Sequence, residues 1–173
     1  MNPAGRFSLI MQSLLFWGLF PFVLPQAIRL RRNAPQVEAA GGPPHGLSGS
    51  GKELRLLAIG DSIIAGVGAG EHADALTGRL AAQLSGELGA GVRWSCVGRI
   101  GATSGTVLEQ LFPDIPAEPA DIILISVGVN DVTSLTRLSK WRRQLRHLLH
   151  AIRCHSPHAV VAFAGIPPLH GFP

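Results

Sequence analysis

Cysteine is scarce in this chain of 173 residues, which contains only Cys96 and Cys154. The two lie far apart and belong to no Cys-x-x-Cys or Cys/His pattern, which argues against a disulfide framework and a structural zinc site. We therefore expect both to be small buried residues. The sequence predicts no metal and no cofactor.

A complete phosphate-binding motif is also lacking. Residues 46–53, GLSGSGKE, have the glycine and lysine spacing of a P-loop, but Glu53 replaces the required Ser or Thr and the segment precedes a strand. Residues 66–70, GVGAG, contain three glycines, but the third is not in register for a dinucleotide fingerprint. Both segments are expected to be flexible loops. A nucleotide-binding, flavodoxin-like protein stays an alternative that requires a phosphate ligand at these loops.

Charge is absent from residues 7–28, FSLIMQSLLFWGLFPFVLPQAI. The run matches the roughly 20 apolar residues that span a bilayer. Its prolines disfavour a buried helix, and the arginines that follow it are unfavourable for export and leave no clear cleavage site. We predict that residues 1–32 are a hydrophobic N-terminal membrane anchor or an uncleaved signal. The following domain is expected to be cytoplasmic, with a periplasmic or secreted location as the alternative.

Basic residues outnumber acidic ones by 15 to 11, for a net charge of +4. This balance suggests nucleic acid or anionic lipid as partners. No nucleic-acid motif accompanies the basic residues, many of which share one candidate helix, so a solvated helix face is expected and nucleic acid is not. Membrane lipid is the predicted partner, through the N-terminal segment. The basic residues of that helix are Arg137, Lys140, Arg142, Arg143, Arg146 and Arg153.

The chain after the apolar run divides into a linker and a domain. Residues 33–53 are rich in Gly, Pro, Ser and Ala without periodicity, which predicts a flexible linker. From residue 54 to 173, apolar runs of strand length alternate with helix-periodic segments, as in a parallel sheet covered on both faces. The expected strands are 54–60, 92–98, 120–128 and 158–166, and the expected helices are 72–88, 104–112 and 134–154.

This alternation defines the expected fold class as α/β: a flavodoxin-like, three-layer α/β/α domain with a parallel sheet. No helix follows the last expected strand, although each added strand of such a sheet normally brings its crossover helix. We therefore expect the domain to be incomplete, truncated after the fourth strand.

Small and polar residues follow three of the expected strands. Ser62 comes after the first, Gly101 after the second and Asn130 after the third. Ligands of open parallel sheets bind beyond the carboxyl ends of the strands, so these residues should converge at one edge. A serine there can present its hydroxyl to an ester carbonyl. For Gly101 taken singly, a role in a turn alone stays open.

Three segments carry a resemblance to a known family. They are GDSIIAGVG at 60–68, GRIGATSG at 98–105 and GVND at 128–131. In this order, at the ends of successive strands, they resemble the SGNH hydrolases, also called the GDSL esterase and lipase family. The resemblance extends from Leu54 to the end of the chain.

The resemblance implies roles for individual residues. Ser62 corresponds to the nucleophile, and the oxyanion hole is formed by the backbone N–H groups of Ser62 and Gly101 and the side-chain amide of Asn130. Asp61 and Asp131 are short carboxylates beside turns. Since such residues usually accept backbone hydrogen bonds, we expect both to fix the loops that carry Ser62 and Asn130.

An Asp-x-x-His segment, from which the family takes its base, is missing from the sequence. A serine hydroxyl is a poor nucleophile without a base. His170 follows the last expected strand, but Pro167 stands three positions before it. Either a missing part of the chain supplies the Asp and His, or the chain is a divergent module that retains only a binding surface. We predict an ester hydrolase that cleaves small acyl esters through an acyl-enzyme on Ser62, with a non-catalytic, membrane-tethered binding module as the alternative.

Overall fold

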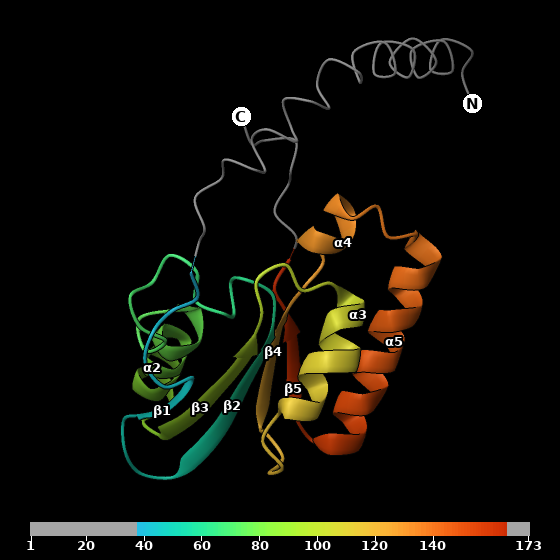
Figure 1. Ribbon diagram of the computed structural model, residues 1–173. Helices are drawn as coiled ribbons and strands as arrows, with labels where there is room; N and C mark the ends of the chain where they lie inside the picture. The colour runs from blue at the N-terminus through green and yellow to red at the C-terminus, as the bar shows by residue number, and fades with distance from the viewer. Residues whose placement is uncertain (1–37, 166–173) are drawn as a thin grey trace, which may run out of the picture. The chain divides into compact units, whose positions relative to one another are not determined.

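A five-stranded sheet forms the centre of the computed structural model, which describes residues 38–165 (Figure 1). Its strands are ordered β1-β3-β2-β4-β5. All neighbouring pairs are parallel except β1 and β3, which are antiparallel. The predicted α/β fold class is therefore confirmed, with an antiparallel edge strand that was not predicted. The strands are β1 (His45–Ser48), β2 (Glu53–Gly60), β3 (Gly91–Gly98), β4 (Ile122–Ser126) and β5 (Val160–Phe163).

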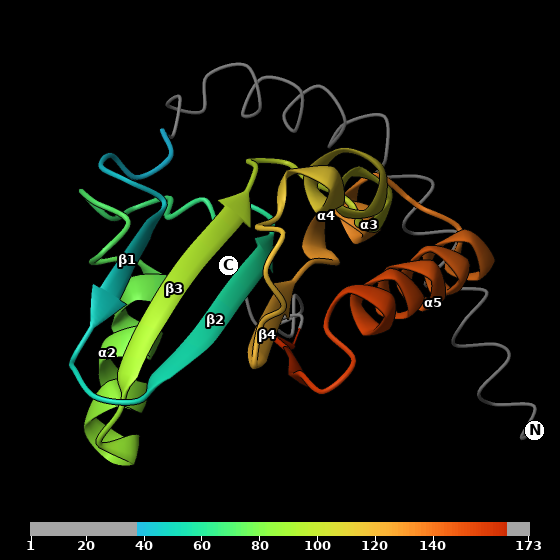
Figure 2. The same cartoon turned by 90° about the horizontal axis from the view of Figure 1, so that it is seen from below.

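Helices cover both faces of this sheet, which gives the three predicted layers (Figure 2). Alternate side chains of β2 point to opposite faces because the side-chain period of a strand is two. Leu56 and Ala58 belong to the apolar cluster that includes α2, whereas Leu57 and Ile59 belong to the cluster that includes η1 and α5. The helices are α2 (Leu76–Leu88), α3 (Ser104–Thr106), η1 (Val107–Leu111), η2 (Phe112–Asp114), α4 (Val129–Thr133) and α5 (Leu138–His155).

The amphipathic helix α5 anchors one of these layers. Leu148 and Ile152, which are four residues apart and therefore on the same side of the helix, are fully buried against the sheet. Burial of a side chain of this size contributes about 1.5–3 kcal/mol. The apolar stripe that predicted a helix over 134–154 is thus the surface that holds α5 in place, although α5 itself begins only at Leu138.

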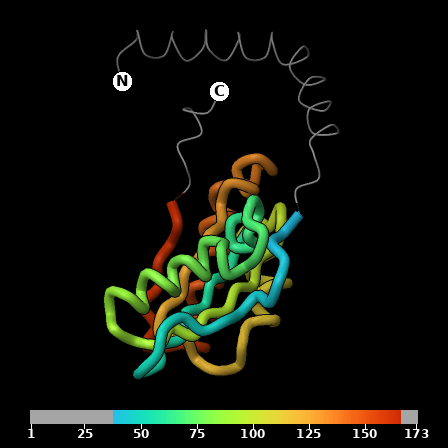
Figure 3. The backbone as a smooth tube through the Cα atoms, turned by 90° about the vertical axis from the view of Figure 1, so that its left-hand side faces the viewer, coloured from blue at the N-terminus to red at the C-terminus, as the bar shows by residue number. Residues whose placement is uncertain are grey.

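The linker prediction for 33–53 is wrong for the part that the structure describes. Residues 45–48 form β1, and Ala40 is buried, with its N–H donating to Ala65 O at 2.9 Å. The described chain therefore begins beside the loop that follows β2 (Figure 3). Glycine in the strand hid β1 from sequence reasoning, yet Gly46 is required because a Cβ there would collide with the ring of Trp94.

Two further expectations need correction. The helix predicted over 72–88 begins at Leu76, because residues 72–75 form turns in which Ala75 N–H donates to His72 O. The expectation of a buried cysteine is confirmed for Cys96 but wrong for Cys154, which is exposed on the outer side of α5.

The predicted membrane anchor over residues 1–32 lies outside the described residues. Within 38–165, none of the helices combines the length and apolar character needed to cross a bilayer.

Candidate active site

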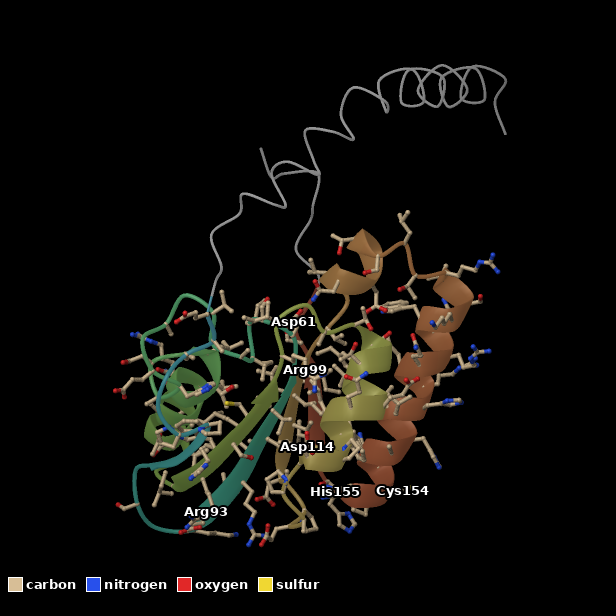
Figure 4. All side chains as sticks on the ribbon, in the orientation of Figure 1. Asp61, Arg93, Arg99, Asp114, Cys154 and His155 are labelled. Atoms are coloured by element: carbon tan, nitrogen blue, oxygen red, sulfur yellow. The ribbon has the colours of Figure 1, made fainter. Side chains whose placement is uncertain are left out.

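Three loops meet at the carboxyl edge of the sheet. Gly60, the last residue of β2, is opposite Gly98 of β3 and Ser126 of β4, so the loops after these parallel strands start side by side. Hydrogen bonds tie them together, from Arg99 N–H to Gly60 O at 3.1 Å and from Asp61 N–H to Ser126 O at 2.9 Å. Asp61 and Arg99 lie at this edge in Figure 4.

The loop that carries Ser62 is held by a buried carboxylate. Asp61 is 3% exposed, and its Oδ1 accepts hydrogen bonds from Ile63 N–H at 3.1 Å and Ser126 Oγ at 3.2 Å. Its backbone carbonyl accepts from Ala65 N–H at 3.0 Å, which closes the turn around a half-buried Ser62. The loop-fixing role predicted for Asp61 is confirmed by these contacts.

Gly101 lies in a tight turn at the end of β3. The turn is closed by Ala102 N–H, which donates to Arg99 O at 3.1 Å, and Gly101 has a φ of +78°. A side chain at this backbone angle is strained, which explains the glycine. A Cβ there would meet nothing within 4 Å, so the surface above this peptide is open.

Asn130 joins its own loop to that of Gly101. Its Nδ2 donates a hydrogen bond of 3.0 Å to Ala102 O, the residue directly after Gly101. The amide nitrogen carries two protons, and this bond uses only one. The geometry therefore brings Asn130 beside the Gly101 turn and leaves one N–H of the amide for a further acceptor.

Asp131 holds the same loop from inside. It is 3% exposed, and its two carboxylate oxygens accept from Ser104 N–H at 2.8 Å and from Ser104 Oγ at 2.7 Å. Ser104 is the first residue of α3, so this contact fixes the start of α3 against α4. The predicted loop-fixing role of Asp131 is confirmed, although its partner Ser104, like the partner Ser126 of Asp61, was not identified from the sequence.

A base for Ser62 is not found among the described histidines. Across residues 38–165, no histidine forms a hydrogen bond with Ser62. His155 lies at the opposite edge of the sheet (Figure 4), where its Nε2 is 2.9 Å from Pro116 O. His170 lies outside the described residues.

A second candidate nucleophile, Cys96, is inactivated by its surroundings. Its Sγ lies 3.4 Å from His72 Nδ1 and 3.5 Å from Pro44 O. Burial raises the pKa of the Cys96 thiol to about 11, so the thiol stays protonated at neutral pH. Cys96 is therefore a packing residue. In the described part of the chain no group of three or more His, Cys, Asp or Glu side chains is placed to bind a metal ion.

A groove of about 650 Å³ lies at the opposite, amino edge of the sheet. Its walls include an ion pair in which Arg93 Nε and Nη2 each donate to Glu53 at 2.9 Å. The groove does not include Ser62, Gly101 or Asn130. The groove and the three polar loops thus lie at opposite edges of the sheet.

Comparison with known proteins agrees with the loop arrangement. The model of the GDSL-like lipase/acylhydrolase family matches residues 58–173, a stretch that contains all three loops. The match covers more than half of the chain, so the protein belongs to the GDSL-like lipase/acylhydrolase family, and the resemblance seen in the sequence is confirmed. Comparison with curated proteins found no relative.

Several solved structures share the fold. TesA superposes with a TM-score of 0.57 at 28% identity, over 68% of this chain and 64% of TesA. AlinE4, an SGNH-hydrolase family esterase, gives a TM-score of 0.59 at 22% identity, over 70% of this chain and 65% of AlinE4. The esterase EstA from Pseudoalteromonas sp. gives 0.53 at 22% identity, over 68% of this chain and 63% of EstA. The chain thus spans a little under two thirds of each of these proteins.

Proposed function

We propose that the chain is a serine ester hydrolase that cleaves small acyl esters through an acyl-enzyme on Ser62. The observation that carries this proposal is the bond from Asn130 Nδ2 to Ala102 O, which ties the Asn130 amide to the Gly101 turn beside the Ser62 loop. Membership of a hydrolase family and the fold shared with esterases support the same reaction class.

In the proposed mechanism, Ser62 Oγ attacks the ester carbonyl carbon and its proton passes to a base. Negative charge then develops on the carbonyl oxygen. Three donors would bind this oxygen: the N–H groups of Ser62 and Gly101 and the second N–H of the Asn130 amide. They stabilise the developing charge because they are already in position before the reaction begins. The alcohol leaves with a proton, and water then hydrolyses the acyl group from Ser62.

Fixed loops support this assignment of roles. Asp61 and Asp131 are buried and each accepts two hydrogen bonds through its carboxylate, from groups of the loops themselves or of the elements beside them. These bonds fix the loops that carry the proposed hydrogen-bond donors. Electrostatic stabilisation of a transition state requires donors that do not have to reorganise when charge develops on the substrate.

In the test, imidazole in solution serves as the base for Ser62, because none of the described histidines contacts that residue. The chain is incubated with a fluorophosphonate probe and increasing imidazole, and the modified residue is found by peptide mass. We expect the label on Ser62, a rate that rises with imidazole, and none of this labelling in a folded Ser62→Ala chain. A label on the wild-type chain no stronger than on Ser62→Ala at saturating imidazole would refute the nucleophile.

The second candidate is a non-catalytic binding module of the same fold. It is favoured by one observation, the lack of a histidine in contact with Ser62 across residues 38–165. This module would bind esters without turnover. It therefore predicts a shift of the Asn130 and Gly101 amide signals on addition of a short-chain ester, with no labelling at any imidazole concentration.

We also propose a membrane location, through the uncharged run at 7–28, with the domain on the cytoplasmic side. The described chain that follows packs on the Ser62 loop, where Ala40 N–H donates to Ala65 O and Gly41 N–H donates to Gly70 O, each at 2.9 Å. Resistance to carbonate extraction would support the anchor. Release of the full chain into the supernatant would rule it out.

A further inference from the structure

The outer side of α5 is a cationic surface without acidic residues. No Asp or Glu occurs between Leu138 and His155. The ion pairs found within residues 38–165, Arg79 with Asp74 and Arg93 with Glu53, lie on other elements. Nitrogen-tipped side chains project from α5 on the side away from the sheet (Figure 4). The exposed cations of this surface are Lys140, Arg142, Arg143, Arg146 and Arg153.

Most of these cations do not stabilise the helix. Arg153 is the exception, because it lies in the last turn and its Nη1 donates to Ala159 O at 2.8 Å. Arg142 and Arg146 are four residues apart, and like charges at that spacing repel each other. Arg137 and Lys140 lie at the N-terminal end, where the helix dipole is positive, and α5 has neither an acidic residue in its first turn nor a side-chain cap. The charge pattern therefore points to a function outside the helix.

An apolar tip lies at the N-terminal end of the same surface. Leu135, in the turn between α4 and α5, is 88% exposed, and Leu138 and Val132 beside it are about half exposed. Leu135 also has a φ of +53°, a conformation that is strained for a leucine. The angle belongs to the turn that ends α4, in which Thr136 N–H donates to Asp131 O at 2.8 Å. That turn does not require a large apolar side chain held out in water, so the exposed leucine is a second feature that packing does not explain.

We propose that the outer side of α5 and the Leu135 tip form a docking surface for an anionic phospholipid membrane. Cations within a Debye length of anionic lipid are attracted to it, and exposed leucines enter the boundary between headgroups and acyl chains. Nucleic acid would also attract the cations. It offers no apolar phase for Leu135 and Leu138, however, so the combination favours lipid.

The inference goes beyond ester hydrolysis, because docking needs no chemistry at Ser62. It also differs from anchoring by residues 7–28, because it assigns membrane contact to α4, α5 and the turn between them. The Leu135 tip follows directly on α4, which carries Asn130, so docking would hold the candidate active site at the lipid surface.

A fluorophore on the tip tests this directly in the full chain. Leu135→Cys is labelled in a Cys154→Ser background, where the remaining Cys96 is buried. Vesicles contain brominated acyl chains, which quench a fluorophore that reaches them, and consist of phosphatidylcholine with or without phosphatidylglycerol. We expect quenching only with phosphatidylglycerol, and its loss when salt is raised from about 0.05 M to about 0.5 M.

Two charge-matched variants locate the surface. Arg143→Gln with Arg146→Gln should lower the ratio of quenched to unquenched tip about tenfold or more, since each cation near anionic lipid contributes appreciably to binding. Lys52→Gln with Arg55→Gln removes the same charge from the amino edge of the sheet and should leave that ratio unchanged. Circular dichroism checks that both variants are folded.

Three results would overturn the proposal. These are equal quenching in both double variants, no quenching in any vesicle, and binding of RNA that the Arg143 and Arg146 changes abolish while the tip stays unquenched. The last would assign the surface to nucleic acid. All measurements are repeated with Ser62→Ala, so failure of docking and failure of the proposed hydrolysis are separate results.

Discussion

The two ends of the sheet differ in how their polar groups are used. At the carboxyl edge, Asp61 and Asp131 are buried, and their carboxylates hold loops by hydrogen bonds of 2.7 to 3.2 Å. At the amino edge, Glu53 and Arg93 pair with each other on the surface, with about half of each side chain exposed, beside a groove of about 650 Å³. The groove and the polar groups of the candidate site thus lie at opposite edges of the sheet. In this molecule, buried and hydrogen-bonded carboxylates identify the candidate site better than the volume of the groove does.

The largest effect is expected at Asn130. Asn130→Ala removes one proposed oxyanion donor, and loss of such a donor typically costs a factor of about 100 to 1,000 in rate. The change also removes the bond to Ala102 O. The imidazole-assisted labelling rate at Ser62 measures the loss. Ser95→Ala, in the groove of the amino edge, is the control and should label at the wild-type rate. A slower Ser95→Ala and a normal Asn130→Ala would reverse the comparison between the two edges.

A stability effect of about 2 kcal/mol is expected at Asp131, because its removal leaves the buried N–H of Ser104 without an acceptor, whereas Ser104 Oγ still has Gln144 Oε1 at 3.0 Å. Urea unfolding of Asp131→Ala, followed by circular dichroism, measures it. Asp131→Asn retains one acceptor and should lose less. If Asp131→Ala unfolds at the wild-type urea concentration, then the buried carboxylate does not hold the loops and the contrast between the edges is lost.

Much of this fold was predictable because the apolar pattern that causes each strand or helix lies within its own stretch of sequence. The apolar run at 120–128 gave β4, and the stripe through Leu148 and Ile152 gave α5, since burial of a face imposes a period that sequence displays. β1 was not predictable. It is only four residues long and contains Gly46, which is there for the ring of Trp94 on another strand.

The candidate site likewise contains residues that the sequence could predict and residues that it could not. Ser62, Gly101 and Asn130 follow strand ends, and their motifs were enough to predict them as site residues. Their supports were missed, because Ser126 is 65 residues from Asp61 and Ser104 is 27 residues from Asp131. A single serine carries no sign in the sequence that it will meet a distant carboxylate. Only the folded sheet creates those partners.

The two edges of the sheet should also differ in the reactivity of the cysteine thiols that lie near them. Cys96, in β3 near the carboxyl edge, is buried and its thiol has a pKa of about 11 instead of the usual 9.0, whereas Cys154, near the amino edge, is exposed. At pH 8 the thiolate fraction of Cys96 is about 100-fold lower than that of an ordinary thiol. Iodoacetamide should therefore modify Cys154 and leave Cys96 intact, as read by peptide mass. Comparable rates at the two thiols would show that the layer around Cys96 opens readily.

The smallest effect is expected for the exposed pair at the amino edge. The hydrogen bond from Arg93 lowers the pKa of Glu53 below its usual 4.5, so the native state binds the proton less readily than the unfolded chain does. The pair therefore stabilises the fold above about pH 4.5, and this contribution disappears as pH falls through the lowered pKa. Glu53→Gln should unfold at slightly lower urea than wild type at pH 7, and the difference should vanish near pH 3 and in 1 M salt, because an exposed pair is screened. The deficit of Asp131→Ala should persist in the same salt, since its carboxylate is buried. A Glu53→Gln deficit as large and as salt-resistant as that of Asp131→Ala would show that both edges are held with equal strength.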